Sequence, residues 1–145
     1  MVALRIKDLS KSFGSTEVLK KINLEIEEGS FIVLLGPSGC GKSTLLNIIA
    51  GLESIDEGSV LIDDYDVSKV EPKDRNIAMV FQSYALYPSM TVKENIIFGL
   101  KQAKVSKNKI DEQLQKVSTF LKVDELLNRK PSQLSGGQRQ RTAMG

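Results

Sequence analysis

The chain has 145 residues, 41% apolar and 26% charged, which suits a single globular domain and disfavours a disordered protein. Its 20 basic and 18 acidic residues leave a net charge of +2, too balanced to indicate a nucleic-acid-binding surface. The absence of histidine excludes histidine-based catalysis and histidine metal ligands, and a single cysteine excludes an intrachain disulfide. No apolar run approaches the roughly 18 residues that span a bilayer, and the first residues do not resemble a signal peptide, so we expect a soluble, cytosolic chain.

Two alternating segments come first. Residues 3–9 and 22–27 alternate apolar and polar side chains, which predicts half-buried strands in an antiparallel layer. Phe13 lies in the turn region between them. It could stack on a nucleotide base or make an apolar contact within the hairpin, and the spacing alone favours the apolar contact.

Residues 31–51, FIVLLGPSGCGKSTLLNIIAG, predict a strand, a glycine-rich loop and a helix. The unbroken apolar run at residues 31–35 is typical of a parallel strand covered on both faces. A helix is expected over residues 42–50, with Gly51 as its C-terminal cap.

The loop in this stretch fits the phosphate-binding pattern GxxxxGK[ST]. It contains three glycines, Gly36, Gly39 and Gly41. They let the backbone curl so that N–H groups face phosphate oxygens at the positive end of the following helix. Lys42 is expected to reach the β and γ phosphates, and the Ser43 hydroxyl to bind Mg²⁺. An ordinary glycine-rich turn is the alternative that this context disfavours. Cys40 is expected to contribute its backbone N–H more than its sulfur.

Residues 59–62 predict a short strand, followed by an acidic cluster of Asp63, Asp64 and Asp66. The cluster could suggest calcium, but Lys69 stands where an EF-hand loop requires glycine, which favours a solvated turn. A second buried strand is predicted at residues 77–81. It ends at Gln82, a position where α/β folds place ligand contacts.

The following residues are mostly helical in pattern. Thr91 and Glu94 form a capping box that begins a short helix, and residues 106–122 show an amphipathic helical spacing with Glu112 and Lys116 as an i,i+4 pair. We therefore treat residues 1–145 as one domain, with a β layer and phosphate-loop core over about 1–82 and a helical subdomain over about 83–145.

The stretch LSGGQ at residues 134–138 is the second informative motif. Ser135 and Gln138 form a capping box, and Gly136 and Gly137 leave the helix start bare, so a phosphate could approach its N–H groups. A plain helix start with structural glycines explains the isolated stretch equally well. The arginines that follow, Arg139 and Arg141, are expected on a solvated face.

Three motifs in this order, GPSGCGKST at residues 36–44, Gln82 after a buried strand, and LSGGQRQR at residues 134–141, resemble the ATP-binding subunit of ATP-binding-cassette (ABC) transporters. Residues 81–101 further resemble importers of the maltose and glycerol-3-phosphate type. The resemblance runs from about Ala3 to the last residue. It implies the α/β fold of a P-loop NTPase, with an N-terminal antiparallel β layer and a helical subdomain.

The resemblance also implies roles for individual residues. Phe13 would stack on adenine, which reverses the preference from spacing alone, while Lys42 and Gln82 would serve catalysis and Ser43 and Gln82 would contact Mg²⁺. The phosphate cradle would consist of Ser38, Gly39, Cys40, Gly41, Lys42, Ser43 and Thr44. In a head-to-tail dimer, the γ-phosphate would be closed over by the other subunit's Ser135, Gly136, Gly137 and Gln138.

The cofactors implied are ATP and Mg²⁺, and the implied function is uptake of a solute, either a carbohydrate or a glycerol phosphate. The partners implied are a second ATP-binding subunit, transmembrane permease subunits that contact residues 82–87 from Gln82 to Tyr87, and indirectly a solute-binding protein, with no nucleic acid. The subunit would lie in the cytoplasm, peripheral on the inner face of the cell membrane.

The 145 residues depart from the family's pattern in one respect. They lack the strand with the Mg²⁺-linked aspartate, the glutamate that positions the attacking water and the switch histidine. We therefore expect an incomplete core sheet and no hydrolysis by this stretch alone, because losing a general base typically costs about 10² to 10⁴ in rate. The alternatives are a non-hydrolysing nucleotide-binding or dimer-competing fragment and, disfavoured by the near-neutral charge, an ABC-type DNA-maintenance ATPase.

Overall fold

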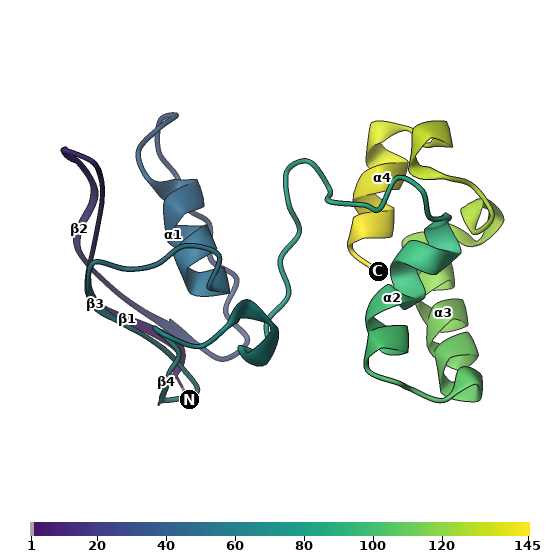
Figure 1. Cartoon of the computed structure of the whole chain (residues 1–145), viewed down its shortest axis with the longest axis horizontal. Coiled ribbons are helices and arrows are strands. Elements are labelled where there is room, and N and C mark those ends of the chain that lie inside the picture. Colours follow the sequence, from purple (N-terminus) through teal and green to yellow (C-terminus); the bar gives the residue numbers. More distant parts are fainter. Residues whose placement is uncertain (1) are drawn as a thin grey trace. The chain divides into compact units, whose positions relative to one another are not determined.

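The computed structural model describes residues 2–145 and divides into two compact units, one up to Met79 and one from Val80 (Figure 1). Each unit has an apolar core of its own. Within residues 2–145, no helix is both long and apolar enough to cross a membrane.

The first unit contains a four-stranded antiparallel sheet in the order β2-β1-β3-β4. Its strands are β1 (Val2–Phe13), β2 (Thr16–Glu27), β3 (Glu57–Ile62) and β4 (Tyr65–Asp66). The strands predicted at residues 3–9, 22–27 and 59–62 lie within β1, β2 and β3, so the antiparallel layer is confirmed. The first two strands are longer than their alternation indicates, because they continue to a tight turn at which Phe13 pairs with Thr16.

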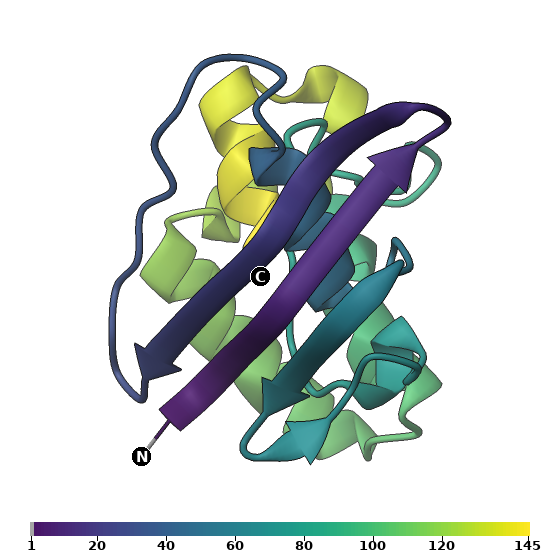
Figure 2. The ribbon, with the colours of Figure 1, turned by 90° about the vertical axis from the view of Figure 1, so that its left-hand side faces the viewer.

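Helix α1 (Lys42–Ala50) covers one face of this sheet (Figure 2). Its Leu45 and Ile48 pack with Ile6, Leu9 and Val60 of β1 and β3, which forms the first apolar core. The predicted helix bounds are confirmed. So is the cap, because Gly51 adopts a left-handed φ of 78° and its N–H donates to the Ile48 carbonyl at 3.0 Å.

The C-terminal end of α1 is held by a buried arginine. Arg75, which follows a short 3-10 helix (Pro72–Asp74), donates from Nη1 to the carbonyls of Ile48 at 2.8 Å and Ile49 at 2.9 Å. Its Nε donates to the Val70 carbonyl at 2.9 Å. Burial lowers the pKa of Arg75. Its positive charge also complements the negative end of the helix dipole, so Arg75 fixes the helix that follows the glycine-rich loop.

The two buried strands predicted at residues 31–35 and 77–81 are wrong. Neither segment forms a strand, and both are largely exposed, with Phe31 91% and Leu35 88% accessible to solvent. The physical reason is that an apolar run satisfies its backbone groups only beside partner strands, and the sheet of the described residues does not extend to either segment. The α/β core sheet is therefore incomplete, as the sequence led us to expect, but it lacks these two strands as well.

The second unit is helical, with α2 (Val92–Gln102), α3 (Lys107–Leu121) and α4 (Gly136–Ala143) joined through short 3-10 helices (Asp124–Leu126 and Pro131–Gln133). The capping box is confirmed: Glu94 Oε2 accepts from the Thr91 N–H at 2.8 Å, and Thr91 Oγ1 accepts from the Glu94 N–H at 3.2 Å. The amphipathic helix is also confirmed, with Glu112 and Lys116 paired at 3.4 Å. The core residues include Val92, Ile96, Ile110, Leu114 and Leu134.

Candidate functional site

The glycine-rich loop enters α1 through two left-handed residues, Gly39 with φ 81° and Gly41 with φ 94°. Gly41 is also tightly enclosed. A Cβ at this position would lie 2.8 Å from Leu19 Cδ2 and 3.2 Å from Val18 Cγ1, both on β2. Its backbone angles and its surroundings therefore both require glycine, and the end of the loop is seated directly on the β1–β2 hairpin.

Lys42 folds back across the loop that precedes it. Its Nζ donates to the carbonyls of Gly36 at 2.8 Å and Pro37 at 2.7 Å, and it lies 3.5 Å from Cys40 Sγ. The two ends of the loop are close together here, because a Cβ on Gly36 would lie 2.6 Å from the same sulfur. Within residues 2–145, the hydrogen bonds of this ammonium group therefore go to groups of the loop itself.

The start of α1 differs from the starts of α2 and α4. Its N-cap residue is Gly41, and no side chain caps its first N–H groups, whereas α2 and α4 are closed by capping boxes. Ser43 is exposed in this uncapped first turn. A helix start without a cap, a curled glycine loop and an adjacent ammonium group together fit a phosphate chain, whose oxygens would accept from all three.

Phe13 stands at the end of β1, where its side chain is 48% exposed. Five and six residues further along the same hairpin are Val18 and Leu19, the side chains against which Gly41 is seated. The hairpin therefore carries both the exposed aromatic ring and the support of the loop. The ammonium group of Lys11 lies over the Phe13 ring at 5.2 Å from its centroid, a contact that the sequence analysis did not predict.

Gln82 lies in the second unit, exposed and outside any helix or strand. The segment after it is tied to α2 by Asn95, whose Oδ1 accepts from the Tyr87 N–H at 2.8 Å and whose Nδ2 donates to the carbonyls of Tyr87 and Met90, each at 3.2 Å. The Tyr87 ring also packs against Phe98, with 4.7 Å between centroids. The sequence analysis missed Asn95. An asparagine in the first turn of an apolar helix was the available signal.

The LSGGQ stretch begins α4 with the expected capping box. Gln138 Oε1 accepts from the Ser135 N–H at 2.8 Å, and Ser135 Oγ accepts from the Gln138 N–H at 3.3 Å. A Cβ on Gly136 or Gly137 would meet no atom within 4 Å, so the packing of the unit does not require either glycine. The expectation for Arg139 is wrong: it is only partly exposed, because its Nη1 donates to the Leu134 carbonyl at 2.6 Å.

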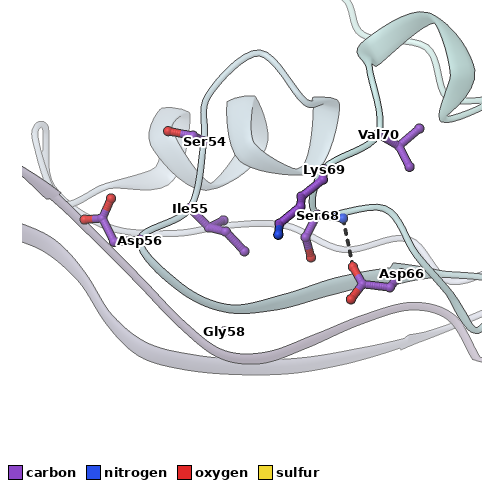
Figure 3. Close-up of a pocket in the computed structure, with 8 residues that line it drawn as sticks. All are labelled: Ser54, Ile55, Asp56, Gly58, Asp66, Ser68, Lys69 and Val70. Atoms are coloured by element: carbon purple, nitrogen blue, oxygen red, sulfur yellow. Dashed lines mark hydrogen bonds between the residues drawn. The ribbon is translucent and has the colours of Figure 1, made fainter.

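A surface hollow of about 740 Å³ lies on the first unit, and no residue of the glycine loop lines it (Figure 3). It is lined by Ser54, Ile55, Asp56, Gly58, Asp66, Ser68, Lys69 and Val70. Its carboxylates already have structural partners: Asp66 accepts from the Ser68 N–H at 2.9 Å, and Asp56 accepts from the Ser12 N–H at 2.7 Å. Hydrogen bonding by the Ser68 side chain, followed by its backbone N–H, lowers the pKa of Asp66.

The acidic cluster after β3 forms a turn. Asp63 and Asp64 have positive φ angles, and Asp64 pairs with Arg5 at 2.9 Å. Within residues 2–145, no group of three or more acidic, cysteine or histidine side chains is arranged to hold a metal ion.

Comparison with known proteins gave concordant results. The family model described as "ABC transporter" matches residues 19–145. Over the whole chain, the sequence is 52% identical to the sn-glycerol-3-phosphate import ATP-binding protein UgpC of Cereibacter sphaeroides and 54% identical to the protein of the same name from Brucella abortus strain 2308. The chain spans only 42% of the length of each of these relatives.

The fold is similar to that of solved ATP-binding cassettes. A dimeric structure of the cassette MJ0796 in a post-hydrolysis state, bound to ADP and Pi, has a TM-score of 0.86 and 34% sequence identity. The match covers 97% of this chain and 67% of that one. A second dimeric structure of MJ0796, described as a bacterial ABC transporter cassette, matches with the same TM-score.

Proposed function

Because the chain belongs to the ABC transporter family, we propose that its glycine loop binds the phosphate chain of ATP. The observation that carries this proposal is the arrangement at the start of α1. The Lys42 ammonium group, 2.8 Å from the Gly36 carbonyl, stands beside a helix start whose N–H groups have no side-chain cap. Bound phosphates would take over the lysine from the loop carbonyls, because a charged acceptor forms the stronger hydrogen bond.

Within this proposal each residue of the loop has a role. Lys42 neutralises the β and γ phosphates, and Ser43, exposed in the first turn of α1, offers its hydroxyl to Mg²⁺. Phe13 stacks on the adenine ring. The backbone N–H groups of the cradle come from Ser38, Gly39, Cys40, Gly41, Lys42, Ser43 and Thr44.

Gln82 is proposed to contact Mg²⁺ or the attacking water when the site is fully assembled. The resemblance to the family implies an acidic residue that positions this water, on a strand that these 145 residues do not contain. Hydrolysis of ATP is therefore proposed only for a chain that also carries that strand, as in a subunit that couples hydrolysis to transport, and not for these 145 residues by themselves.

The helix start at residues 135–138 is proposed to close over the γ-phosphate held by a second copy or a related subunit. In a helix interior, glycine is less favourable than alanine by about 1 kcal/mol. Packing requires neither Gly136 nor Gly137, so the close approach of a phosphate held by another subunit explains both glycines. Ser135 and Gln138 keep the N-terminus of α4 in place through their capping box.

The transported solute is proposed to be a glycerol phosphate or a carbohydrate, because similar proteins are named as glycerol-3-phosphate import ATP-binding proteins. The permease subunits would dock at the segment from Gln82 to Tyr87, whose last residue is bonded to Asn95 of α2. The protein would then lie on the cytoplasmic face of the cell membrane and serve a solute-binding protein indirectly.

Substitution of Lys42 tests the phosphate site. Lys42→Ala should weaken binding of Mg·ATP about 10- to 100-fold, because it removes a charge-assisted hydrogen bond to the phosphates. Titration calorimetry of the chain measures the affinity. Lys73→Ala is the matched control, since it removes a positive charge from an exposed position of the same unit. Equal affinity of Lys42→Ala and the wild-type chain would refute the proposal.

A further inference from the structure

Lys11 is a buried lysine close to the proposed base-binding aromatic. It lies two residues before Phe13 on β1, and only 7% of its side chain is exposed. Its Nζ pairs with Glu53 at 2.8 Å and Asp56 at 3.6 Å and bonds to Ser54 Oγ at 3.2 Å. The same ammonium group lies over the Phe13 ring, 5.2 Å from the centroid.

These partners fix the position of the ammonium group. The two carboxylates come from the segment between α1 and β3, and Asp56 also accepts from the Ser12 N–H at 2.7 Å, next to Phe13. The hydrogen bond between Lys11 and Glu53 raises the pKa of Lys11 and lowers that of Glu53. Lys11 is thus a fixed positive charge and cannot move freely as an exposed lysine would.

A fixed cation on one face of an aromatic ring restricts where the ring can lie. The negative π face of Phe13 is attracted to the ammonium group, which opposes rotation of the ring at the tip of the hairpin. About half of the Phe13 surface remains exposed. The ring can therefore present its other face to a planar ligand without first losing conformational freedom.

We infer that Lys11 is a positioning residue for recognition of the base: its ammonium group holds one face of the Phe13 ring so that the other face stacks on a purine. This inference rests on the proposed ATP site. The alternative is that Lys11 only ties residues 53–56 to β1. In that case its removal would change the affinity for a ligand with a base and for one without a base by the same factor.

Two ligands separate these roles. Mg·ATP has a base and Mg·tripolyphosphate does not, so the ratio of their affinities reports the contribution of the base. In Lys11→Met, which keeps a long apolar side chain, Mg·ATP should bind about two- to fivefold more weakly, the size that a cation–π contact supports, while Mg·tripolyphosphate binds as before. Lys11→Arg, which retains a cation, should restore the ratio. Calorimetry on the full chain gives both affinities.

Phe13→Leu provides the internal control. It should lower the affinity ratio by at least as much, and adding Lys11→Met to it should change the ratio no further, because the lysine acts through the ring. If Lys11→Met does not fold by circular dichroism, Lys11→Met/Glu53→Gln removes the unpaired carboxylate and carries the same comparison.

The outcomes distinguish this inference from the function on which it rests. If neither ligand binds the wild-type chain, the proposed phosphate site is wrong. If both bind and Lys11→Met, alone or with Glu53→Gln, leaves the affinity ratio unchanged or weakens both ligands equally, Lys11 has only a structural role and the inference is overturned.

Discussion

At the scale of single residues, two buried cations organise the surroundings of the phosphate loop. Lys11 anchors the segment after α1 to β1 through Glu53 and Asp56. Arg75 holds the C-terminal end of α1 through the carbonyls of Ile48 and Ile49 and also bonds to the Val70 carbonyl. Buried charges need partners, and these two have them from segments far along the chain. Both belong to the support of the site and make no contact that the glycine motif itself would predict.

Removing Arg75 should destabilise α1. Arg75→Met removes three hydrogen bonds to carbonyls, one of them buried and two partly buried, so the opening free energy of the α1 amides should fall by about 2–3 kcal/mol. Hydrogen exchange followed by mass spectrometry measures this opening locally. Lys73→Met, an exposed position two residues earlier, should change it little. Unchanged protection of the α1 amides in Arg75→Met would show that the Arg75 hydrogen bonds do not stabilise α1.

At the scale of elements, the helices begin as their local sequences require. The capping box of α2 includes a hydrogen bond from the Thr91 N–H to the Glu94 carboxylate, and this bond lowers the pKa of Glu94. Because the folded pKa lies below the ordinary value of 4.5, the stability that this carboxylate contributes is complete at neutral pH. It is lost as the pH falls through that ordinary value toward the lower folded pKa.

Glu94→Gln should reduce this acid sensitivity. Glutamine keeps an acceptor for the capping box but does not titrate, so the fall in melting temperature between pH 7 and about pH 3.5 should be smaller in the variant. Some pH dependence should remain, since Asp124 of the same unit also has a lowered pKa, caused mainly by its hydrogen bond from Thr119. Melting followed by circular dichroism at 222 nm measures the effect.

Glu112→Gln is the control for this comparison, because it removes a carboxylate from an exposed site on α3. A melting profile of Glu94→Gln that falls with pH as steeply as the wild-type profile would contradict the role assigned to the Glu94 carboxylate.

At the scale of the whole molecule, the two units contain different parts of the proposed site. The first has the phosphate loop and Phe13, and the second has Gln82 and the LSGGQ helix start. Each unit has a core, but residues 31–35 and 77–81 expose apolar side chains and form no sheet. The glycine-rich loop therefore forms from local structure, although the strands predicted for the central sheet do not form.

This organisation predicts that the 145-residue chain binds Mg·ATP without turning it over. Binding needs the loop, the uncapped helix start and Lys42, whereas hydrolysis also needs a positioned carboxylate that these residues do not supply. Binding by calorimetry, combined with a phosphate-release assay on the same preparation, checks both statements. Sustained release of phosphate that Lys42→Ala abolishes would show that the chain contains a complete catalytic site.

The features that could be predicted from the sequence depend on residues close together in the chain. The bounds of α1, the glycine cap at Gly51 and the capping boxes at Thr91 and Ser135 all involve groups within about one helical turn of each other. Nearby residues are in contact whatever the rest of the chain does, so their pattern is sufficient. The phosphate-loop motif belongs to this class, and for the same reason.

The features that only the tertiary structure decided depend on distant partners. Residues 31–35 have the pattern of a buried strand, but a strand forms only where another strand pairs with it, and this pairing is absent here. Lysine and arginine are usually surface residues, but Lys11 and Arg75 are buried because segments more than 20 residues away surround them. The sequence by itself therefore determined the glycine-rich loop motif and the helix after it, whereas tertiary contacts decided which apolar runs are covered and which charges are buried beside the loop.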